Sequence, residues 1–152
     1  MTNKLGSQEQ QASANSLLGT WKLQSFTLEY ADTREKLEPF GAHPHGYLGY
    51  GPDGRMYAII VHERRGRPPE IPSDAEKIDL FSGMGAYAGT YKVDGEIVRH
   101  YVDISWIESW TGTTQLRRFR VDGNLLYIQS PAAKDPLDGR ISSAVLVWAK
   151  IQ

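Results

Sequence analysis

The sequence predicts an all-β protein, an eight-stranded antiparallel up-and-down barrel with one short helix. Most of the chain consists of short segments that are rich in β-forming residues and separated by turn formers. Two Asp-Gly pairs, at 94–95 and 122–123, stand between alternating segments and are typical of tight hairpins. A Gly-Thr-Trp at 19–21 begins the first strand, and we expect its indole to close one end of the barrel. Barrels of this size commonly enclose a pocket for one small ligand.

Length and composition narrow the class of protein. A chain of 152 residues is long enough for one domain with a sizeable core. The net charge of -1 gives no long-range field that would attract nucleic acid or an anionic membrane, and no apolar run approaches the ~20 residues of a membrane span. The absence of Cys excludes disulfides, thiolate metal sites and Cys nucleophiles. We expect a cytoplasmic protein without a nucleic-acid or membrane partner.

Two parts of the chain differ in composition. Residues 1–16 are polar, dominated by Gln, Ser and Asn, and lack the apolar stretch of a signal peptide. We expect a disordered tail here, with a short helix across one barrel mouth as the alternative. Residues 17–152 then form the barrel domain.

The first half of the chain contains three predicted strands. Residues 19–30 alternate and form the first strand, and 31–45 hold turn formers and prolines and indicate a loop. Strands at 46–50 and 55–62 follow, joined by a Gly-Pro-Asp-Gly turn. This turn fits either of two loop lengths, so the register of these two strands stays open.

The only predicted helix covers residues 74–83. Three prolines between 63 and 73 prevent a central strand before it, and Ser73 is suited to be its N-cap. The remaining strands are predicted at 86–93, 96–106, 113–121, 124–130 and 141–151.

The first Asp-Gly turn predicts the orientation of His100. If Val93 faces Glu96, then Gly89 faces His100, and both lie on the more apolar face of the hairpin. We therefore expect His100 to point into the barrel, next to a glycine that leaves room above it.

The second Asp-Gly turn predicts a second pair of inward polar residues. If Val121 faces Asn124, then Gln115 and Arg117 share the inner face, while the outer face carries arginines suited to solvent. An inward Arg is costly unless it is paired or touches water or a ligand. With His100, these residues form the expected polar lining of an otherwise apolar cavity.

Aromatic residues are candidates for the rest of the cavity wall, since an apolar ring with a polar tip suits a ligand site. Ordinary barrel packing explains the same residues equally well, and Trp21 and Trp148 are assigned to packing. The candidate ligand-binding residues are Tyr50, Tyr57, Tyr87, Tyr91, Trp106, Trp110, Gln115 and Phe119.

The chain shows no motif for a metal or a nucleotide cofactor, and we expect neither. His43 and His45 lie in a loop with a proline between them, and no set of three or four inward ligands accompanies them. No glycine-rich segment leads from a strand into a helix as a phosphate loop does. A Gly-x-Ser-x-Gly elbow is also missing, so nothing supports a hydrolase triad.

Six segments spread over residues 17–150 carry a family resemblance. They are LLGTWKLQSF, EPFGAHPHGYLGYGPDGRM, AYAGTYKVDG, the stretch from His100 to Trp110, TGTTQLRRF and AVLVWAK. In this order and spacing they resemble the lipocalin-like domain proteins of the calycin type. The resemblance implies an eight-stranded barrel with a ligand cavity, in which His100, Gln115 and Arg117 match positions of the family pattern. It does not fix a function, although some small barrels of natural-product pathways are cofactor-free cyclases or isomerases.

Two functions explain the expected cavity. We favour a cofactor-independent cyclase or isomerase of polyketide- or terpenoid-type metabolism, in which His100 moves a proton and Arg117 holds an enolate or carboxylate. The alternative is a non-enzymatic carrier of a small hydrophobic ligand, with His100 and Arg117 as a buried polar network that fixes the barrel register. A third function, an interaction module that uses the barrel exterior, lacks an obvious exposed apolar stripe. A homodimer stays open.

Overall fold

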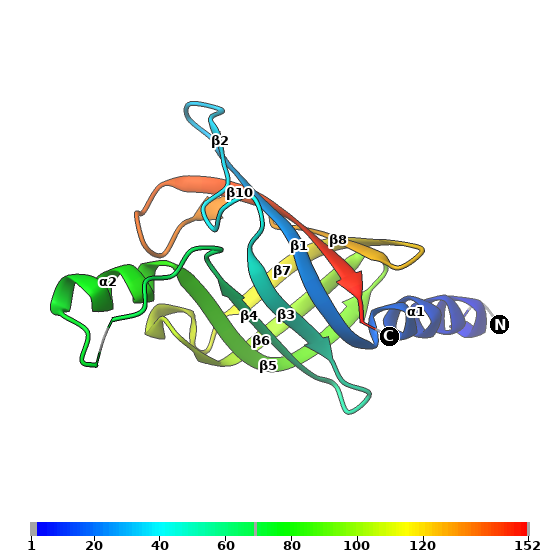
Figure 1. Ribbon diagram of the computed structural model, residues 1–152. Coiled ribbons are helices and arrows are strands. Elements are labelled where there is room, and N and C mark those ends of the chain that lie inside the picture. The colour runs from blue at the N-terminus through cyan, green and yellow to red at the C-terminus, as the bar shows by residue number, and fades with distance from the viewer. Residues whose placement is uncertain (1–2, 69, 152) are drawn as a thin grey trace.

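In the described residues, strands form one antiparallel sheet that closes into a barrel (Figure 1). The computed structural model describes residues 3–68 and 70–151. Strands β1 and β10 pair with each other and close the sheet. The eight wall strands are β1 (Gly19–Tyr30), β3 (His45–Tyr50), β4 (Arg55–Val61), β5 (Met84–Asp94), β6 (Ile97–Ser105), β7 (Thr114–Asp122), β8 (Leu125–Gln129) and β10 (Ile141–Lys150). Two-residue strands, β2 (Lys36–Leu37) and β9 (Ala133–Lys134), add to β1 and β10. The predicted eight-stranded antiparallel barrel is confirmed.

The first Asp-Gly hairpin turns one residue later than the sequence suggested. Asp94 pairs with Ile97, so the loop consists of Gly95 and Glu96, and Val93 does not face Glu96 as expected. The physical reason is that the positive φ, 61°, falls on Gly95, which adopts it without steric cost, while the aspartate stays in the strand.

The second hairpin is displaced in the same way. Asp122 pairs with Leu125, and Gly123 has a φ of 59°, so Val121 does not face Asn124. Moving a two-residue loop by one residue changes each cross-strand partner by two positions, and side chains two positions apart share a face. The expected pairs were therefore wrong, but the inward and outward faces are those that the sequence predicted.

Gly89 has a different role from the one expected. It pairs with Val102 rather than with His100, and beside it the register of β5 and β6 shifts. A Cβ on Gly89 would collide with the backbone carbonyl of Tyr101. The glycine therefore allows the two strands to approach at a β-bulge, and it does not serve to make room above the histidine.

The N-terminal segment is a helix, α1 (Asn3–Leu17), and not the disordered tail expected for residues 1–16. Residues 1 and 2 lie outside the described residues. Leu17 is fully buried, and its carbonyl accepts a hydrogen bond from the indole of Trp21 at 2.8 Å, so the last turn is tied to the barrel. The earlier turns are exposed, and their polar composition is that of a helix that faces solvent.

Helix α2 (Asp74–Ser82) lies at the opposite end of the barrel from α1 (Figure 1). It begins with a capping box, in which the Ser73 hydroxyl accepts from the Glu76 amide and the Glu76 carboxylate accepts from the Ser73 amide. Within the described residues, neither helix combines the length and the apolar character needed to cross a membrane.

The α1 end of the barrel is closed by aromatic packing. Trp21 and Trp148 are each 1% exposed and belong to one core cluster with Leu17. The Lys150 ammonium lies 4.7 Å from the centre of the Trp21 ring and donates to the Leu18 carbonyl. This plug leaves the α2 end as the side from which a molecule reaches the interior.

The outer wall carries more apolar surface than expected. Tyr47, Tyr57, Ile59 and Ile104 are between 41% and 65% exposed. Cross-strand pairing puts Tyr47 beside Ile59 on β3 and β4. The expectation that the exterior lacks an apolar stripe was therefore wrong for the face formed by β3 to β6.

The bulge at Gly89 leads to a prediction about stability. Gly89→Ala should lower the free energy of unfolding by about 2 kcal/mol, because the clash is with backbone and no rotamer change relieves it. The matched control is Gly66→Ala, since a Cβ there meets nothing within 4 Å. Urea unfolding of both variants and the wild type checks this, and equal stability of the two variants would contradict the role assigned to Gly89.

Candidate functional site

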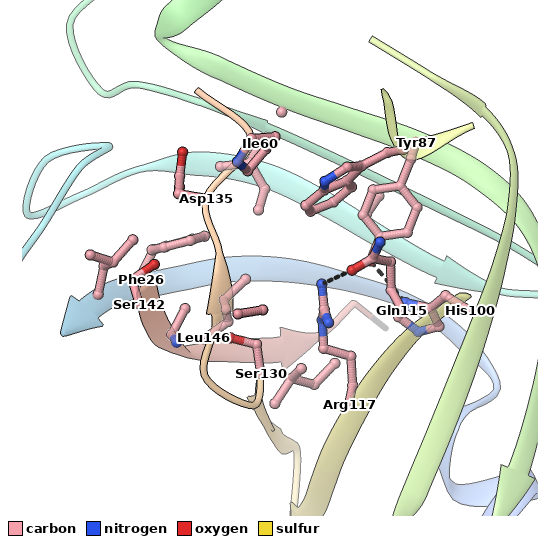
Figure 2. Close-up of a pocket in the computed structure, with 18 of the residues that line it drawn as sticks. Phe26, Ile60, Tyr87, His100, Gln115, Arg117, Ser130, Asp135, Ser142 and Leu146 are labelled. Atoms are coloured by element: carbon pink, nitrogen blue, oxygen red, sulfur yellow. Dashed lines mark hydrogen bonds between the residues drawn. The ribbon is translucent and has the colours of Figure 1, made fainter. Parts of the chain in front are cut away.

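A cavity of about 530 Å³ occupies the barrel between the aromatic plug and the α2 end (Figure 2). This volume lies within the range of small-molecule sites. Most of its lining is apolar, including Phe26, Phe40, Ile60, Met84, Trp106 and Leu146. The polar side chains His100, Gln115 and Arg117 come from the neighbouring strands β6 and β7 and line one wall.

His100 is the centre of a three-residue hydrogen-bonded chain. It is 1% exposed, and both ring nitrogens have tyrosine partners. Nε2 lies 2.7 Å from the Tyr50 hydroxyl, and Nδ1 lies 2.8 Å from the Tyr87 hydroxyl. Tyr87 itself lines the cavity. His100 therefore connects a residue of the cavity wall to a tyrosine buried beneath it.

Burial keeps the three members of this chain uncharged. It lowers the pKa of His100 to about 3, with a smaller contribution from the nearby Arg117 charge. It also raises the pKa of the Tyr50 hydroxyl well above its ordinary value, and raises that of Tyr87, where the Arg117 guanidinium opposes the rise. Near neutral pH the chain thus consists of a neutral imidazole between two phenols.

Arg117 is held in place by hydrogen bonds rather than by a carboxylate. Its Nη1 donates to the Leu116 carbonyl at 2.8 Å, and its Nη2 donates to the Gln115 side-chain oxygen at 3.5 Å (Figure 2). The Gln115 amide nitrogen donates to the Thr113 hydroxyl, which in turn donates to the Trp110 carbonyl. The loop between β6 and β7 therefore orients the guanidinium.

The charge of Arg117 has no ionic partner among the described residues. None of the ion pairs in that part of the chain includes it. Its neighbour Arg118 points outward and lies 4.0 Å from Glu96. A guanidinium on a mostly apolar wall is costly unless something pairs with it, so the arrangement favours a ligand with a hydrogen-bond acceptor.

The structure separates the aromatic candidates into two groups. Tyr87, Trp106 and Trp110 line the cavity with Gln115, and the two indoles pack edge to face with centroids 5.6 Å apart. Tyr50 does not line the cavity, but its hydroxyl is hydrogen-bonded to His100, which does. The remaining three do not line it: Tyr57 is 45% exposed on the outer wall, Tyr91 packs on Tyr50 and donates to the Gly51 carbonyl, and Phe119 is core.

Sequence reasoning missed several residues of the cavity. Phe26 lines it because the β1–β10 register shifts between Leu23 and Ser25, which reverses the alternation that starts at Trp21. The segment 131–137 also reaches the cavity, with Asp135 at its edge (Figure 2). A bulge inside a continuous β-forming strand leaves no mark in the sequence, and the segment 131–137 lies between the strands predicted at 124–130 and 141–151, where no contact was predicted.

No group of three or more His, Asp or Glu side chains that could hold a metal ion occurs among residues 3–68 and 70–151. His43 and His45 are both exposed, and the His62 Nδ1 accepts from the Arg64 amide.

Comparison with known proteins agrees with this fold. The closed barrel with an internal cavity defines a lipocalin-like barrel, an architecture of small-molecule binding proteins. The profile of the lipocalin-like domain family matches residues 18–151, and the chain belongs to this family. Among solved structures, the chain is similar to a lipocalin-like protein from Bacteroides uniformis, with 16% sequence identity and a TM-score of 0.44. The match covers 90% of this chain and 99% of that chain. The comparison with curated proteins gives no match.

The buried histidine predicts a pH dependence of stability. The unfolded imidazole binds a proton near pH 6.5 and the folded one near 3, so acid favours the unfolded state. The contribution is complete above pH 6.5 and is lost as the pH falls toward 3. Between about pH 7 and about pH 5, the wild type should lose ~2 kcal/mol more stability than His100→Gln.

Urea unfolding at the two pH values measures this difference. Carboxylates titrate in the same range in both proteins, and the comparison removes their effect. His43→Gln, in an exposed loop, should follow the wild type. Parallel losses in the wild type and in His100→Gln would show that the histidine is not buried in its neutral form.

Proposed function

We propose that the protein binds one small, mostly apolar molecule inside the barrel, with an oxygen-bearing group of that molecule against Arg117. The observation that carries the proposal is a mostly apolar cavity of about 530 Å³ with His100, Gln115 and Arg117 together on the wall formed by β6 and β7. Burial of apolar ligand surface supplies most of the affinity in such a site, and a few polar groups fix the orientation. Family membership supports small-molecule binding in general.

The binding geometry follows from the position of the polar wall. His100, Gln115 and Arg117 lie on β6 and β7, deep in the barrel, whereas Ser82 and Asp135 lie toward the mouth. The oxygen-bearing end of the ligand therefore goes in first, and the apolar remainder extends between Phe26 and the indoles toward the mouth.

A second candidate function is a cofactor-independent isomerase or cyclase acting on a polyketide- or terpenoid-type carbonyl compound. The observation that favours it is the neutral chain Tyr50–His100–Tyr87, which ends on the cavity wall near Arg117. A phenol beside a guanidinium can donate a proton to a developing enolate while the positive charge stabilises it. The enclosing wall would hold the substrate in a reactive conformer. Catalysis by His100 would pass through Tyr87, because both ring nitrogens already have partners.

The binding proposal predicts the effect of filling the cavity. Ala144→Trp places an indole inside, so binding of the neutral dye Nile red should weaken at least tenfold. Val145→Trp is the matched control, because Ala144 lines the cavity and Val145 is 42% exposed on the outer wall. Dye fluorescence measures binding, and circular dichroism confirms folding. Equal dye binding by both folded variants would sink the proposal.

The enzyme candidate predicts proton exchange on a bound carbonyl compound. In heavy water, with chelator present, the protein should speed exchange of the proton next to the carbonyl of an apolar enone, followed by NMR. Arg117→Met removes the charge and keeps much of the volume, so the rate should fall by about two orders of magnitude. Arg118→Met should leave the rate unchanged. An enone that binds but exchanges no faster than in buffer would decide for the carrier.

A further inference from the structure

The hydrogen-bond partners of Tyr50 determine which nitrogen of His100 carries the proton. The Tyr50 side chain is 2% exposed, and within the described residues its hydroxyl has one hydrogen-bond partner, the His100 Nε2. A buried O–H group requires an acceptor. Tyr50 therefore donates to Nε2, which must be the nitrogen without a proton.

The proton of neutral His100 then lies on Nδ1. A neutral imidazole has one N–H donor and one acceptor nitrogen, and the lowered pKa keeps this ring neutral near pH 7. Nδ1–H donates to the Tyr87 oxygen at 2.8 Å. In the opposite tautomer, the Tyr50 hydroxyl proton would be buried without an acceptor.

Because His100 donates to Tyr87, the Tyr87 hydroxyl proton is free to bind a ligand. Its oxygen accepts from His100, so its own O–H does not point at the imidazole. Tyr87 lines the cavity, and Figure 2 shows it on the same side of the cavity as Gln115. Tyr87 is therefore a hydrogen-bond donor toward the cavity.

Arg117 adds further donors to this wall. The Gln115 amide nitrogen donates to Thr113, so its oxygen is turned toward Arg117 and accepts from it. A guanidinium has five N–H donors, of which the Leu116 carbonyl and Gln115 engage two. The remaining donors and the unpaired charge of Arg117 are left for a ligand.

We propose that the ligand is an apolar carboxylic acid whose carboxylate accepts hydrogen bonds from both Arg117 and Tyr87. The inference rests on the proposed binding function and specifies its ligand class. A ketone or alcohol would accept from the same donors but would leave the guanidinium charge unpaired. A carboxylate pairs that charge and forms charge-assisted hydrogen bonds, which are roughly twice as strong as neutral ones.

Three compounds with one hydrocarbon chain test the ligand class. Decanoate, decanol and methyl decanoate are titrated against the complex of Nile red with the full chain. Decanoate should displace the dye at a concentration about tenfold lower than the alcohol or the ester does. Arg117→Met should remove this preference, Tyr87→Phe should reduce it, and Arg118→Met should preserve it.

The tautomer is tested separately by nitrogen NMR of the His100 ring. The inference requires a protonated Nδ1 and an unprotonated Nε2. A proton on Nε2 would overturn it, because Tyr87 would then donate to His100 and not to a ligand. A folded Tyr50→Phe variant should lose the preference for that tautomer, since Nε2 loses its donor.

The outcomes separate the ligand class from the binding function. Equal displacement by the three compounds overturns the carboxylate assignment and leaves cavity binding intact. Dye binding that is absent, or that survives Ala144→Trp unchanged, overturns both.

Discussion

The pairing of β1 with β10 is the constraint on which the rest of the structure depends. β1 is 12 residues long and pairs with both β3 and β10, so one strand joins the two ends of the sheet. Closure removes the free edges and turns every inward side chain toward one enclosed volume. The plug of Trp21 and Leu17 closes one end. Polar groups on the inner face must therefore find partners inside the barrel.

That requirement explains the polar wall. His100 is neutral and has a tyrosine on each nitrogen, and Gln115 connects Arg117 to the β6–β7 loop through Thr113. The ring nitrogens of His100 and the side chain of Gln115 are hydrogen-bonded within the protein, whereas the charge of Arg117 has no ionic partner among the described residues. The wall thus combines a hydrogen-bonded network with one unpaired charge. Such a network fixes the position of the Arg117 guanidinium and also the register of the barrel strands.

Binding and catalysis make different use of the same wall. A carrier needs only the shape of the cavity and the donors that orient its ligand. An isomerase would also need a group that exchanges a proton with the substrate, and of the hydrogen-bonded residues Tyr50, His100 and Tyr87, the buried Tyr50 does not line the cavity. The geometry therefore directs attention to Tyr87, which touches the cavity, more than to His100, whose nitrogens are occupied.

Sequence patterns predicted the strands, the capped helix at 74–83, which the structure has at 74–82, and the inward faces of β6 and β7. These features depend on local propensity and on the two-residue period of a strand. They predicted the inward positions of His100 and Arg117 even though both hairpin pairings were wrong, since a displacement of two positions preserves the face. The face on which these polar residues lie thus depends only on whether their position along the strand is odd or even, and the sequence specifies this directly.

Only the tertiary structure decided the rest. The β1 register shift that brings Phe26 inward, the bulge at Gly89 and the helix tied down by Leu17 depend on contacts between segments distant in the chain. The same holds for the tyrosines on His100, because Tyr50 and Tyr87 come from β3 and β5 and no local pattern links them to β6. Sequence by itself determined the inward positions of His100, Gln115 and Arg117, because strands β6 and β7 keep a regular alternation over these residues. Closure of the barrel decided which of them meet, since that depends on the register of every strand around the wall.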